Sequence, residues 1–465
     1  MLPLVLIGAG IVVSVFIEMY YKKSESILPW FSALLFFVTA VISLSNVETK
    51  SVIFQGMLAT GGIVNIFYFV FTAGAAIVSI LSADYIKKYG ANYGEYYILI
   101  QSSVLGMMVM AGARDLFMIF LGLELMSIPF YVLAGVNRKR AAGNEASLKY
   151  FLLGAFATGF LVYGIALIYG GAHSTSFEII TANFSVLSGN VLFLVGILLF
   201  LVGFSFKIAA FPFHVWVPDV YQGSPTTVAG LFSTGGKAAA FAAIIVTLTA
   251  LFSGTPNEIF APYLAVVSVF SMLFGSIVAL SQDNVKRMLA YSSISHAGYI
   301  LIGLTSGSPE GVAGVIFYLS VYTFMNLAAF GVIAIVEGEN ETNLEINSYT
   351  GLGSRKPFLA ALLSIALFSL AGIPPLAGFF AKYYIFIAAV KSGFTWLAII
   401  GVISSVISVY FYLRIVVVMY FRESDEVPEI SISKTGMFAV ILSTLIIILL
   451  GVLPGSLIDL ISSFL

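Results

Sequence analysis

The chain has 465 residues, of which 60% are hydrophobic and only 9% are charged, and its formal net charge is -1. So few charges exclude a soluble globular protein of this size, because an ordinary soluble domain carries about 25% charged residues. The near-neutral balance gives no indication of a nucleic-acid partner, and the absence of cysteine excludes disulfides, thiolate metal sites and iron–sulfur clusters from this chain.

Apolar stretches long enough to span a membrane follow one another along the whole chain. A secretory signal has basic residues before its apolar stretch, and the first stretch here has none. We therefore expect it to be retained as a span. The pattern predicts an all-α polytopic membrane protein with about fourteen transmembrane helices. The predicted spans cover 2–20, 28–45, 61–85, 96–111, 114–135, 148–170, 189–218, 225–252, 260–280, 286–306, 312–336, 357–391, 394–421 and 436–461.

Two of these stretches, 189–218 and 357–391, are too long for one span. Each contains proline, at Pro212 and Pro218 in the first and at Pro374 and Pro375 in the second. Proline removes a backbone donor and clashes with the preceding turn. We therefore predict two broken helices, although simple kinks would also fit. Irregular backbone at membrane depth has to face protein or water.

Lysine and arginine are unevenly distributed between the loops. Loops after odd-numbered spans hold 13 of the 21 basic residues, and loops after even-numbered spans hold 3. By the positive-inside rule, this predicts a multi-pass protein of the inner (plasma) membrane with both termini on the outer, periplasmic side. The acidic segment 337–356 is predicted to be the one soluble-looking insert.

The remaining five basic residues fall within predicted spans. They are Lys149, Lys207, Lys237, Lys382 and Arg414. A charge at the bilayer centre costs at least about 2.5–3.5 kcal/mol on insertion scales, so each requires a reason. Arg414 lies near the end of its span and is expected to snorkel to the interface. Lys149 opens the sixth span, where either snorkelling or a buried role is compatible with its position.

Ionisable residues also recur at one depth. Glu124, Lys237 and His296 lie at the middles of spans five, eight and ten, and Lys207 and Lys382 lie beside the two breaks. Taken alone, the histidine could be a packing residue and a lysine could be half of a structural ion pair. Five such groups at similar depth favour a functional row. Because desolvation lowers the pKa of lysine and raises that of glutamate, such a row suits proton transfer.

The two broken spans suggest an internal repeat. They are five spans apart, and each has a lysine by its break, so spans four to eight would correspond to spans nine to thirteen. An odd offset inverts the second unit in the membrane, as in many transporters. The predicted organisation has four parts: three N-terminal helices in 1–95, a five-helix repeat in 96–252, an inverted five-helix repeat in 260–421, and a C-terminal helix in 436–465.

Several segments together carry a family resemblance: FLGLELMSIPFYVLAG, SLKYFLLG, FKIAAFPFHVWVPDVYQGSPT, VKRMLAYSSISHAGY and AGIPPLAGFFAKYYIF. They resemble the antiporter-like subunits of proton-pumping NADH–quinone oxidoreductase, respiratory complex I, which are related to the large subunits of multi-subunit cation/proton antiporters. The segment DVYQGSPT is more similar to subunit N than to its paralogues. Lys382 argues against subunit M, which carries glutamate at that point.

The resemblance implies roles for individual residues. It pairs Glu124 with Lys207, makes Lys237 the central lysine with His296 beside it, and makes Lys382 the terminal lysine of a second half-channel. It further implies that Lys149 is another buried lysine of the first repeat.

The resemblance also implies what surrounds this chain. A subunit of this kind moves protons, whereas NADH oxidation and quinone reduction occur elsewhere in the complex. We therefore expect no cofactor here, with FMN, iron–sulfur clusters and quinone in other subunits. The expected partners are the lipid bilayer and other membrane subunits of complex I, including a neighbouring antiporter-like subunit.

Two other functions fit the sequence less well. A stand-alone Na⁺ or K⁺/proton antiporter subunit would need several oxygen ligands for the metal ion, whereas most of the buried charges here are lysines, which repel it. A membrane redox enzyme is disfavoured because the chain has three histidines, no cysteine and no GxGxxG nucleotide loop. The three histidines are His173, His214 and His296.

Overall fold

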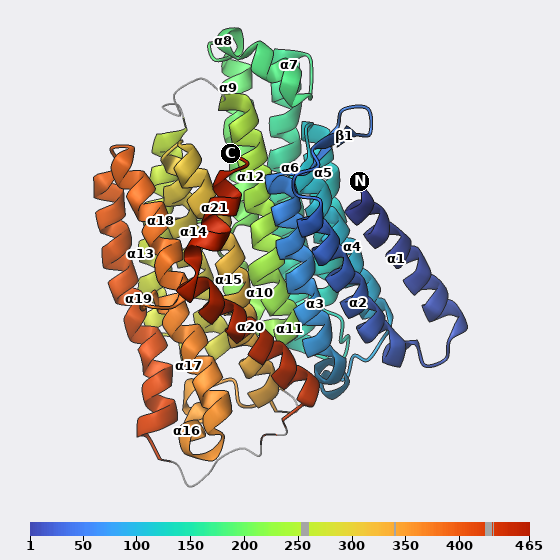
Figure 1. Ribbon diagram of the computed structural model, residues 1–465, viewed down its shortest axis with the longest axis vertical. Coiled ribbons are helices and arrows are strands. Elements are labelled where there is room, and N and C mark those ends of the chain that lie inside the picture. Colours follow the sequence, from blue (N-terminus) through green and yellow to red (C-terminus); the bar gives the residue numbers. More distant parts are fainter. Residues whose placement is uncertain (253–259, 339–340, 424–429, 431) are drawn as a thin grey trace.

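The computed structural model describes residues 1–252, 260–338, 341–423, 430 and 432–465. Long helices run roughly side by side between two ends of the molecule (Figure 1). Helices predominate because every backbone polar group in hydrocarbon has to be satisfied within the segment itself. In the N-terminal part the elements are α1 (Leu2–Tyr20), α2 (Ser24–Ser45), β1 (Ser51–Ile53), β2 (Leu58–Thr60) and α3 (Ile63–Tyr89).

The middle of the chain continues with α4 (Glu95–Gly112), α5 (Leu116–Ala134), α6 (Ala141–Ala172), α7 (Phe177–Ala182), α8 (Phe184–Leu187), α9 (Val191–Lys207), α10 (Val217–Gly223), α11 (Thr226–Leu231), the π-helix η1 (Phe232–Gly236) and α12 (Lys237–Phe252). The C-terminal part contains α13 (Ala261–Leu280), α14 (Val285–Thr305), α15 (Pro309–Val336), the 3₁₀ turn η4 (Ile346–Tyr349), α16 (Leu352–Arg355), α17 (Pro357–Ala371), α18 (Ala377–Lys391), α19 (Thr395–Phe421), α20 (Lys434–Val452) and α21 (Pro454–Ser462).

Every predicted span overlaps one of these helices or a consecutive group of them, and the all-α class is confirmed apart from the short β1–β2 hairpin. By length and apolar composition, ten helices of the described chain qualify as membrane-crossing. The ten do not include α4 or α14. Nearly all of α14 is buried inside the protein, where a helix contacts other helices and not lipid, so its sequence need not be apolar. The number fourteen stays a prediction.

Both predicted breaks are present. In the first, α9 ends at Lys207 and α10 begins at Val217; in the second, α17 ends at Ala371 and α18 begins at Ala377. A further interruption, which the sequence analysis did not predict, separates α20 from α21 at Pro454. Proline is tolerated there because it occupies the first turn of α21, where its missing N–H has no helical partner.

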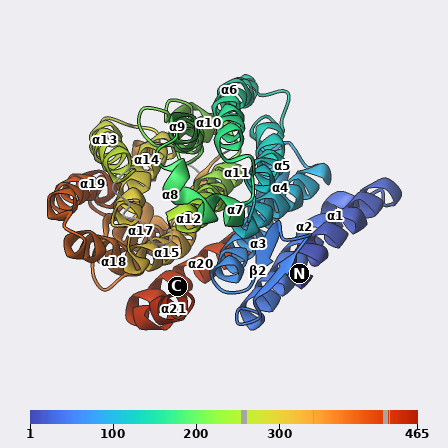
Figure 2. The ribbon, with the colours of Figure 1, turned by 90° about the horizontal axis from the view of Figure 1, so that it is seen from above.

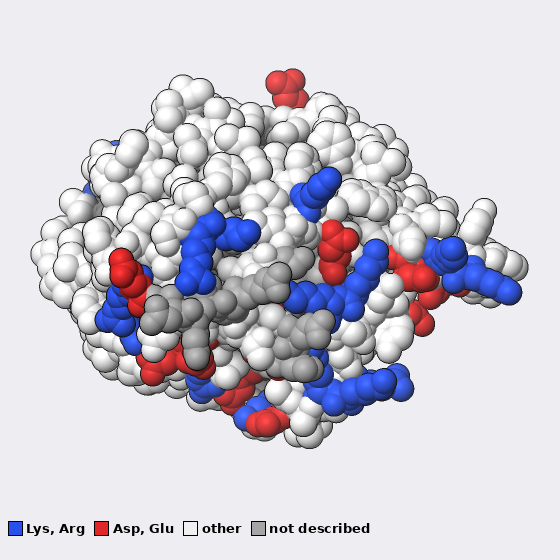
Figure 3. Space-filling model, turned by 90° about the horizontal axis from the view of Figure 1, so that it is seen from below, with Lys and Arg blue, Asp and Glu red and all other residues white. Residues whose placement is uncertain are grey.

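Both termini lie at the same end of the molecule (Figure 1). The Met1 amino group donates to Thr60 Oγ1 at 3.5 Å, and Lys50 Nζ lies 5.8 Å from the ring of Phe464, so both termini adjoin the β1–β2 hairpin. Lysine and arginine side chains gather at the opposite end (Figure 3), where α3 and α15 finish; we call this the basic end. The side of the membrane that each end faces stays a prediction.

The two predicted repeats occupy different parts of the bundle. Seen from above, the helices from α4 to α12 lie between the α1–α3 group and the helices from α13 to α19 (Figure 2). Helix α15 is enclosed by its neighbours and packs against α3, α11, α14, α17, α18 and α20. The boundaries and the inverted relation of the repeats stay predictions.

Candidate functional site

The predicted site residues differ in their burial. Lys207, Lys237, His296 and Lys382 are all buried, with 2–7% of each residue exposed. Glu124 is half-buried. Among the described residues, none of these three lysines forms an ion pair with a carboxylate. Within the described chain, direct ion pairs therefore do not hold these three lysines in place.

The first break supplies hydrogen bonds for the backbone that leaves the helix. Trp216 Nε1 donates to the carbonyl of Phe206 at 3.0 Å, and the backbone N–H of Phe211 donates to Ser271 Oγ at 2.9 Å. Such partners are required because unpaired backbone groups at membrane depth are costly. These hydrogen bonds stabilise the non-helical segment that follows Lys207, the last residue of α9.

The Lys207 ammonium lies against the face of α5 that carries Glu124. Lys207 Nζ donates to Ser127 Oγ at 2.9 Å and to Tyr131 OH at 3.1 Å. The Glu124 carboxylate accepts from Thr158 Oγ1 of α6 at 3.0 Å. Because Glu124, Ser127 and Tyr131 are spaced by three and four residues, they share one helix face. The two charges therefore lie near each other without a direct ion pair, and Ser127 occupies the helix turn next to Glu124.

Lys237 lies directly after the π-helix η1. Its ammonium contacts both the carbonyl and the hydroxyl oxygen of Ser293 in α14, and it lies 5.7 Å from the ring centre of Tyr322 in α15. A π-turn inside an α-helix is rare and is frequent at functional sites. Here it precedes the central lysine and positions it against α14 and α15.

His296 is bonded at both ring nitrogens. Its Nδ1 lies 2.6 Å from Tyr318 OH and its Nε2 lies 3.0 Å from Tyr412 OH. Tyr412 OH also contacts Ser292 Oγ. A neutral imidazole has one donor and one acceptor nitrogen, so a proton taken up at one nitrogen can be released from the other.

Lys382 lies next to the second break. Its Nζ donates to the carbonyl of Ala371, the last residue of α17, at 2.9 Å and to Ser405 Oγ at 2.8 Å. The ammonium is thus placed at a helix C-terminus, where the dipole favours a cation. It also lies 5.0 Å from the ring of Tyr299.

These contacts form a row of buried polar and aromatic side chains along α14, which we call the α14 path. Its helix, α14, contributes Ser292, Ser293, His296 and Tyr299, and its two ends are lysines. Hydrogen bonds join Lys237 to Ser293, and Ser292, the next residue along the chain, to Tyr412 and then to His296. From His296 the path continues by ring contacts through Tyr299 to Lys382.

Toward Lys207 the path is interrupted by aromatic rings. Tyr131, which accepts from Lys207, packs edge-on against Tyr150 at 4.9 Å, and Tyr150 packs against Phe232 of η1 at 5.5 Å. Trp216 stacks on Tyr150 with ring centres 4.4 Å apart. An apolar aromatic cluster therefore occupies the route from Lys207 toward the helix that carries Lys237.

Lys149 departs from the expectation that it is buried. Its side chain is 42% exposed, and Nζ forms ion pairs with Glu145 at 2.7 Å and Asp219 at 2.8 Å. Arg287 binds the other oxygen of Asp219 at 2.7 Å. Helix α6 begins at Ala141 and not near Lys149, so the lysine has a carboxylate one turn before it on the same face. The expected buried lysine is thus a member of a partly exposed ion-pair cluster.

Sequence reasoning missed several groups of the site. The sequence does not single out Tyr318, Tyr412 or Ser293, although Tyr318 and Tyr322 are spaced four apart on one helix. Lys286 and Glu337, treated as loop residues, are both buried. In the described part of the chain, no group of three or more histidine, aspartate or glutamate side chains could hold a metal ion.

Comparison with known proteins identifies the family of this chain. The family model described as NADH:quinone oxidoreductase/Mrp antiporter, TM matches residues 113–408. The subunit N of NADH-quinone oxidoreductase from Trichlorobacter lovleyi is 42% identical over 96% of this chain and 92% of its own length. The subunit N 1 from Chloroherpeton thalassium is 41% identical over 87% of this chain and 85% of its own. This chain belongs to the subunit N family.

Solved structures with a similar fold include chains of respiratory complex I and of an Mrp complex. A chain of respiratory complex I from Thermus thermophilus is 31% identical, with a TM-score of 0.84, and the match covers 98% of both chains. A chain of the Mrp complex from Dietzia sp. has a TM-score of 0.87 at 20% identity, covering 99% of this chain and 96% of the other, and so shares the fold.

Proposed function

We propose that this chain is a proton-translocating membrane subunit of an NADH–quinone oxidoreductase, and that it moves protons along buried lysine and histidine side chains. The observation that carries the proposal is the α14 path, which aligns Lys237, His296 and Lys382 along α14 through hydrogen bonds and ring contacts. The family to which the chain belongs supports it, because the relatives are named as subunits of that enzyme.

In this proposal each group holds or passes a proton and no group binds a metal ion. Lys237 holds a proton against Ser293, His296 passes it between its two phenol partners, and Lys382 receives it at the end of α17. Glu124 sets the charge state of Lys207. Lys149, in its ion-pair cluster with Asp219, would act at the edge of the path and not within it. The driving step, quinone reduction, together with FMN and the iron–sulfur clusters, belongs to other subunits of the assembly, among them a neighbouring antiporter-like subunit.

The proposal differs from a stand-alone cation/proton antiporter in what the purified chain can do. In liposomes that contain this chain alone, we expect a Na⁺ or K⁺ gradient to drive no proton movement, because the buried ammonium groups repel metal cations. In contrast, liposomes that contain the whole oxidoreductase should develop a pH difference across the membrane when NADH and quinone are added. Cation-driven proton exchange by the chain alone would support the antiporter function instead.

We further propose that both termini face the outer side of the inner membrane. The lack of cysteine allows single thiols to be placed at Ser463, at the end with the termini, and at Lys139, in the loop between α5 and α6. A membrane-impermeant maleimide should label Ser463→Cys in right-side-out vesicles and Lys139→Cys only in inverted vesicles. The opposite labelling pattern would overturn the orientation derived from the basic residues.

A further inference from the structure

A buried acid and a buried base lie at the basic end, outside the α14 path. Glu337, the residue that follows α15, is 2% exposed, and Lys286, at the start of α14, is fully buried. Neither forms an ion pair within the described chain. Charged groups without a partner charge are expensive to bury, so their retention in the interior requires a reason.

One short turn connects the two groups. Lys286 Nζ donates to the carbonyl of Ser224 at 2.6 Å. Two residues later, Thr226 Oγ1 donates to the Glu337 carboxylate at 2.6 Å. The turn 224–226 joins α10 to α11, so it holds the base on one side and the acid on the other.

The same elements lead to Lys237. Lys286 and Ser293 are seven residues apart on α14, which places them on one face, two turns or roughly 10 Å from each other. The hydroxyls of Tyr221 and Tyr322 both approach the Ser293 side chain, which contacts Lys237. Within the described chain, the buried hydroxyl of Ser224 has no hydrogen-bond partner.

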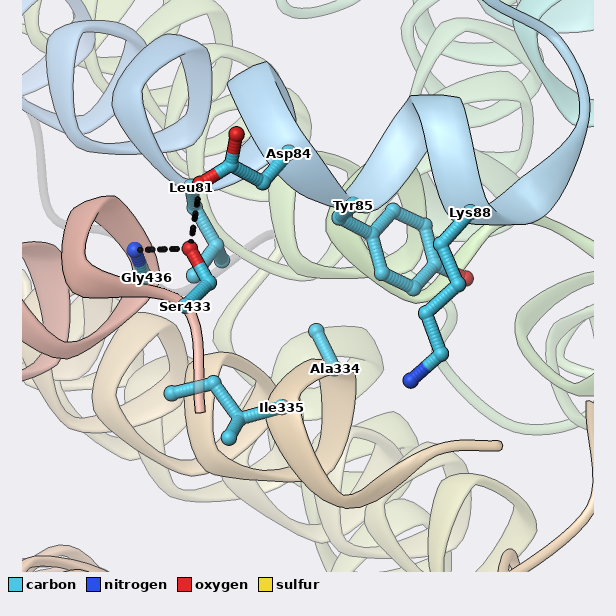
Figure 4. Close-up of a pocket in the computed structure, with 8 residues that line it drawn as sticks. All are labelled: Leu81, Asp84, Tyr85, Lys88, Ala334, Ile335, Ser433 and Gly436. Carbon is cyan, nitrogen blue, oxygen red and sulfur yellow. Dashed lines mark hydrogen bonds between the residues drawn. The ribbon is translucent and has the colours of Figure 1, made fainter. Parts of the chain in front are cut away.

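The acid is also connected to the surface. Tyr85 OH of α3 donates to Glu337 at 2.9 Å, and the Lys88 ammonium contacts the backbone carbonyl of Glu337. Both side chains line an open pocket of about 430 Å³ between α3, α15 and the start of α20 (Figure 4). In its wall, Asp84 accepts from Ser433 Oγ at 2.6 Å and so holds the start of α20.

We propose that Glu337 and Lys286 form a proton relay between this pocket and Lys237; this rests on the proposed function. A hydronium ion in the pocket gives up its proton, leaving water; the Tyr85 hydroxyl takes this proton as it passes its own to the Glu337 carboxylate, where an O–H bond forms. That bond then breaks as an N–H bond forms on the neutral amine of Lys286. Lys286 becomes neutral again when its proton passes toward Ser293 and binds the neutral amine of Lys237. The other charged and titratable groups around the relay are Lys88, Tyr89, Tyr349 and the Arg140–Glu341 ion pair, in which the atoms are 3.3 Å apart.

A purely structural role makes a different prediction. Glu337 contacts Tyr85 of α3 and Thr226 of α11, so it could serve only to fasten three helices together. Glutamine would keep those hydrogen bonds but could not carry a proton. The comparison of Glu337→Gln with Glu337→Asp therefore separates the two roles.

The test uses the whole oxidoreductase in inverted membrane vesicles, with proton uptake measured against pH. We expect Glu337→Gln to slow proton uptake at least about tenfold, the scale on which positioned acids and bases act. Glu337→Asp should restore most of the rate with an altered pH profile. Glu345→Gln, which removes an exposed carboxylate from the same loop, should match the unmodified complex.

The outcomes that overturn the relay are distinct from failure of the proposed function. Assembled Glu337→Gln complex that pumps at the unmodified rate and pH profile would overturn the relay, as would equal defects in the Gln and Asp variants with an unchanged pH profile. If Lys237→Ala pumps normally, the proposed function itself fails. If Glu337→Gln does not accumulate in the membrane, Lys286→Met gives the same test with the same expected loss.

Discussion

Replacement of Lys237 by alanine is expected to lower proton translocation and the coupled quinone reductase rate at least about tenfold while the complex still assembles. The ammonium contacts only neutral groups of Ser293 and the ring of Tyr322 among its described partners, so its removal leaves no unpaired buried carboxylate. The helices around it should therefore pack as before. The measurement is proton pumping and quinone reduction in vesicles, at matched amounts of assembled complex.

Thr247→Ala is the matched control for the Lys237 variant. Thr247 lies on the same helix, is buried, and donates to the carbonyl of Ala243 in its own helix at 2.7 Å. This control should pump normally if the defect of Lys237→Ala arises from the lost proton carrier. A Lys237→Ala complex that assembles fully and pumps at the unmodified rate would contradict the role of this lysine.

Glu124 and Lys207 are expected to act as one unit in proton pumping. The double variant Glu124→Gln with Lys207→Met should pump little worse than either single variant, with a coupling of about 1–3 kcal/mol when the defects are expressed as free energies. The physical reason is that a nearby carboxylate keeps an ammonium charged, and either loss abolishes that control. Ser127 provides the intermediate contact, because it accepts from Lys207 at 2.9 Å and lies one turn from Glu124.

A second double-variant comparison tests whether the coupling between Glu124 and Lys207 is specific to that pair. Glu178→Gln removes an exposed carboxylate that pairs with Arg114 at 3.3 Å, and its combination with Lys207→Met should be additive. Simple addition of the defects in the Glu124 and Lys207 cycle as well would mean that the two residues have separate tasks. The coupled switch would then be wrong, even though both residues were needed.

The sequence alone determined the all-α class and the positions of most helices because hydrocarbon imposes one rule on every residue. Apolar stretches of sufficient length become helices, and proline at Pro212 and Pro374–Pro375 ends them, so the positions of the helices and of both breaks could be predicted. The burial of Lys207, Lys237 and Lys382 followed from the same rule, since each lies far from the end of its apolar stretch.

Tertiary structure decided what each charged group contacts, because hydropathy gives the cost of burial and not the identity of the neighbour. Lys207 and Glu124 each bind a hydroxyl group, of Ser127 and Thr158, and not each other. Lys149 forms an ion pair with Asp219. Tertiary structure also buried Lys286 and Glu337, which lie at helix ends where sequence fits either exposure or burial. A charged residue at a helix end becomes buried only when other helices cover it, and here the 224–226 turn and α3 do so.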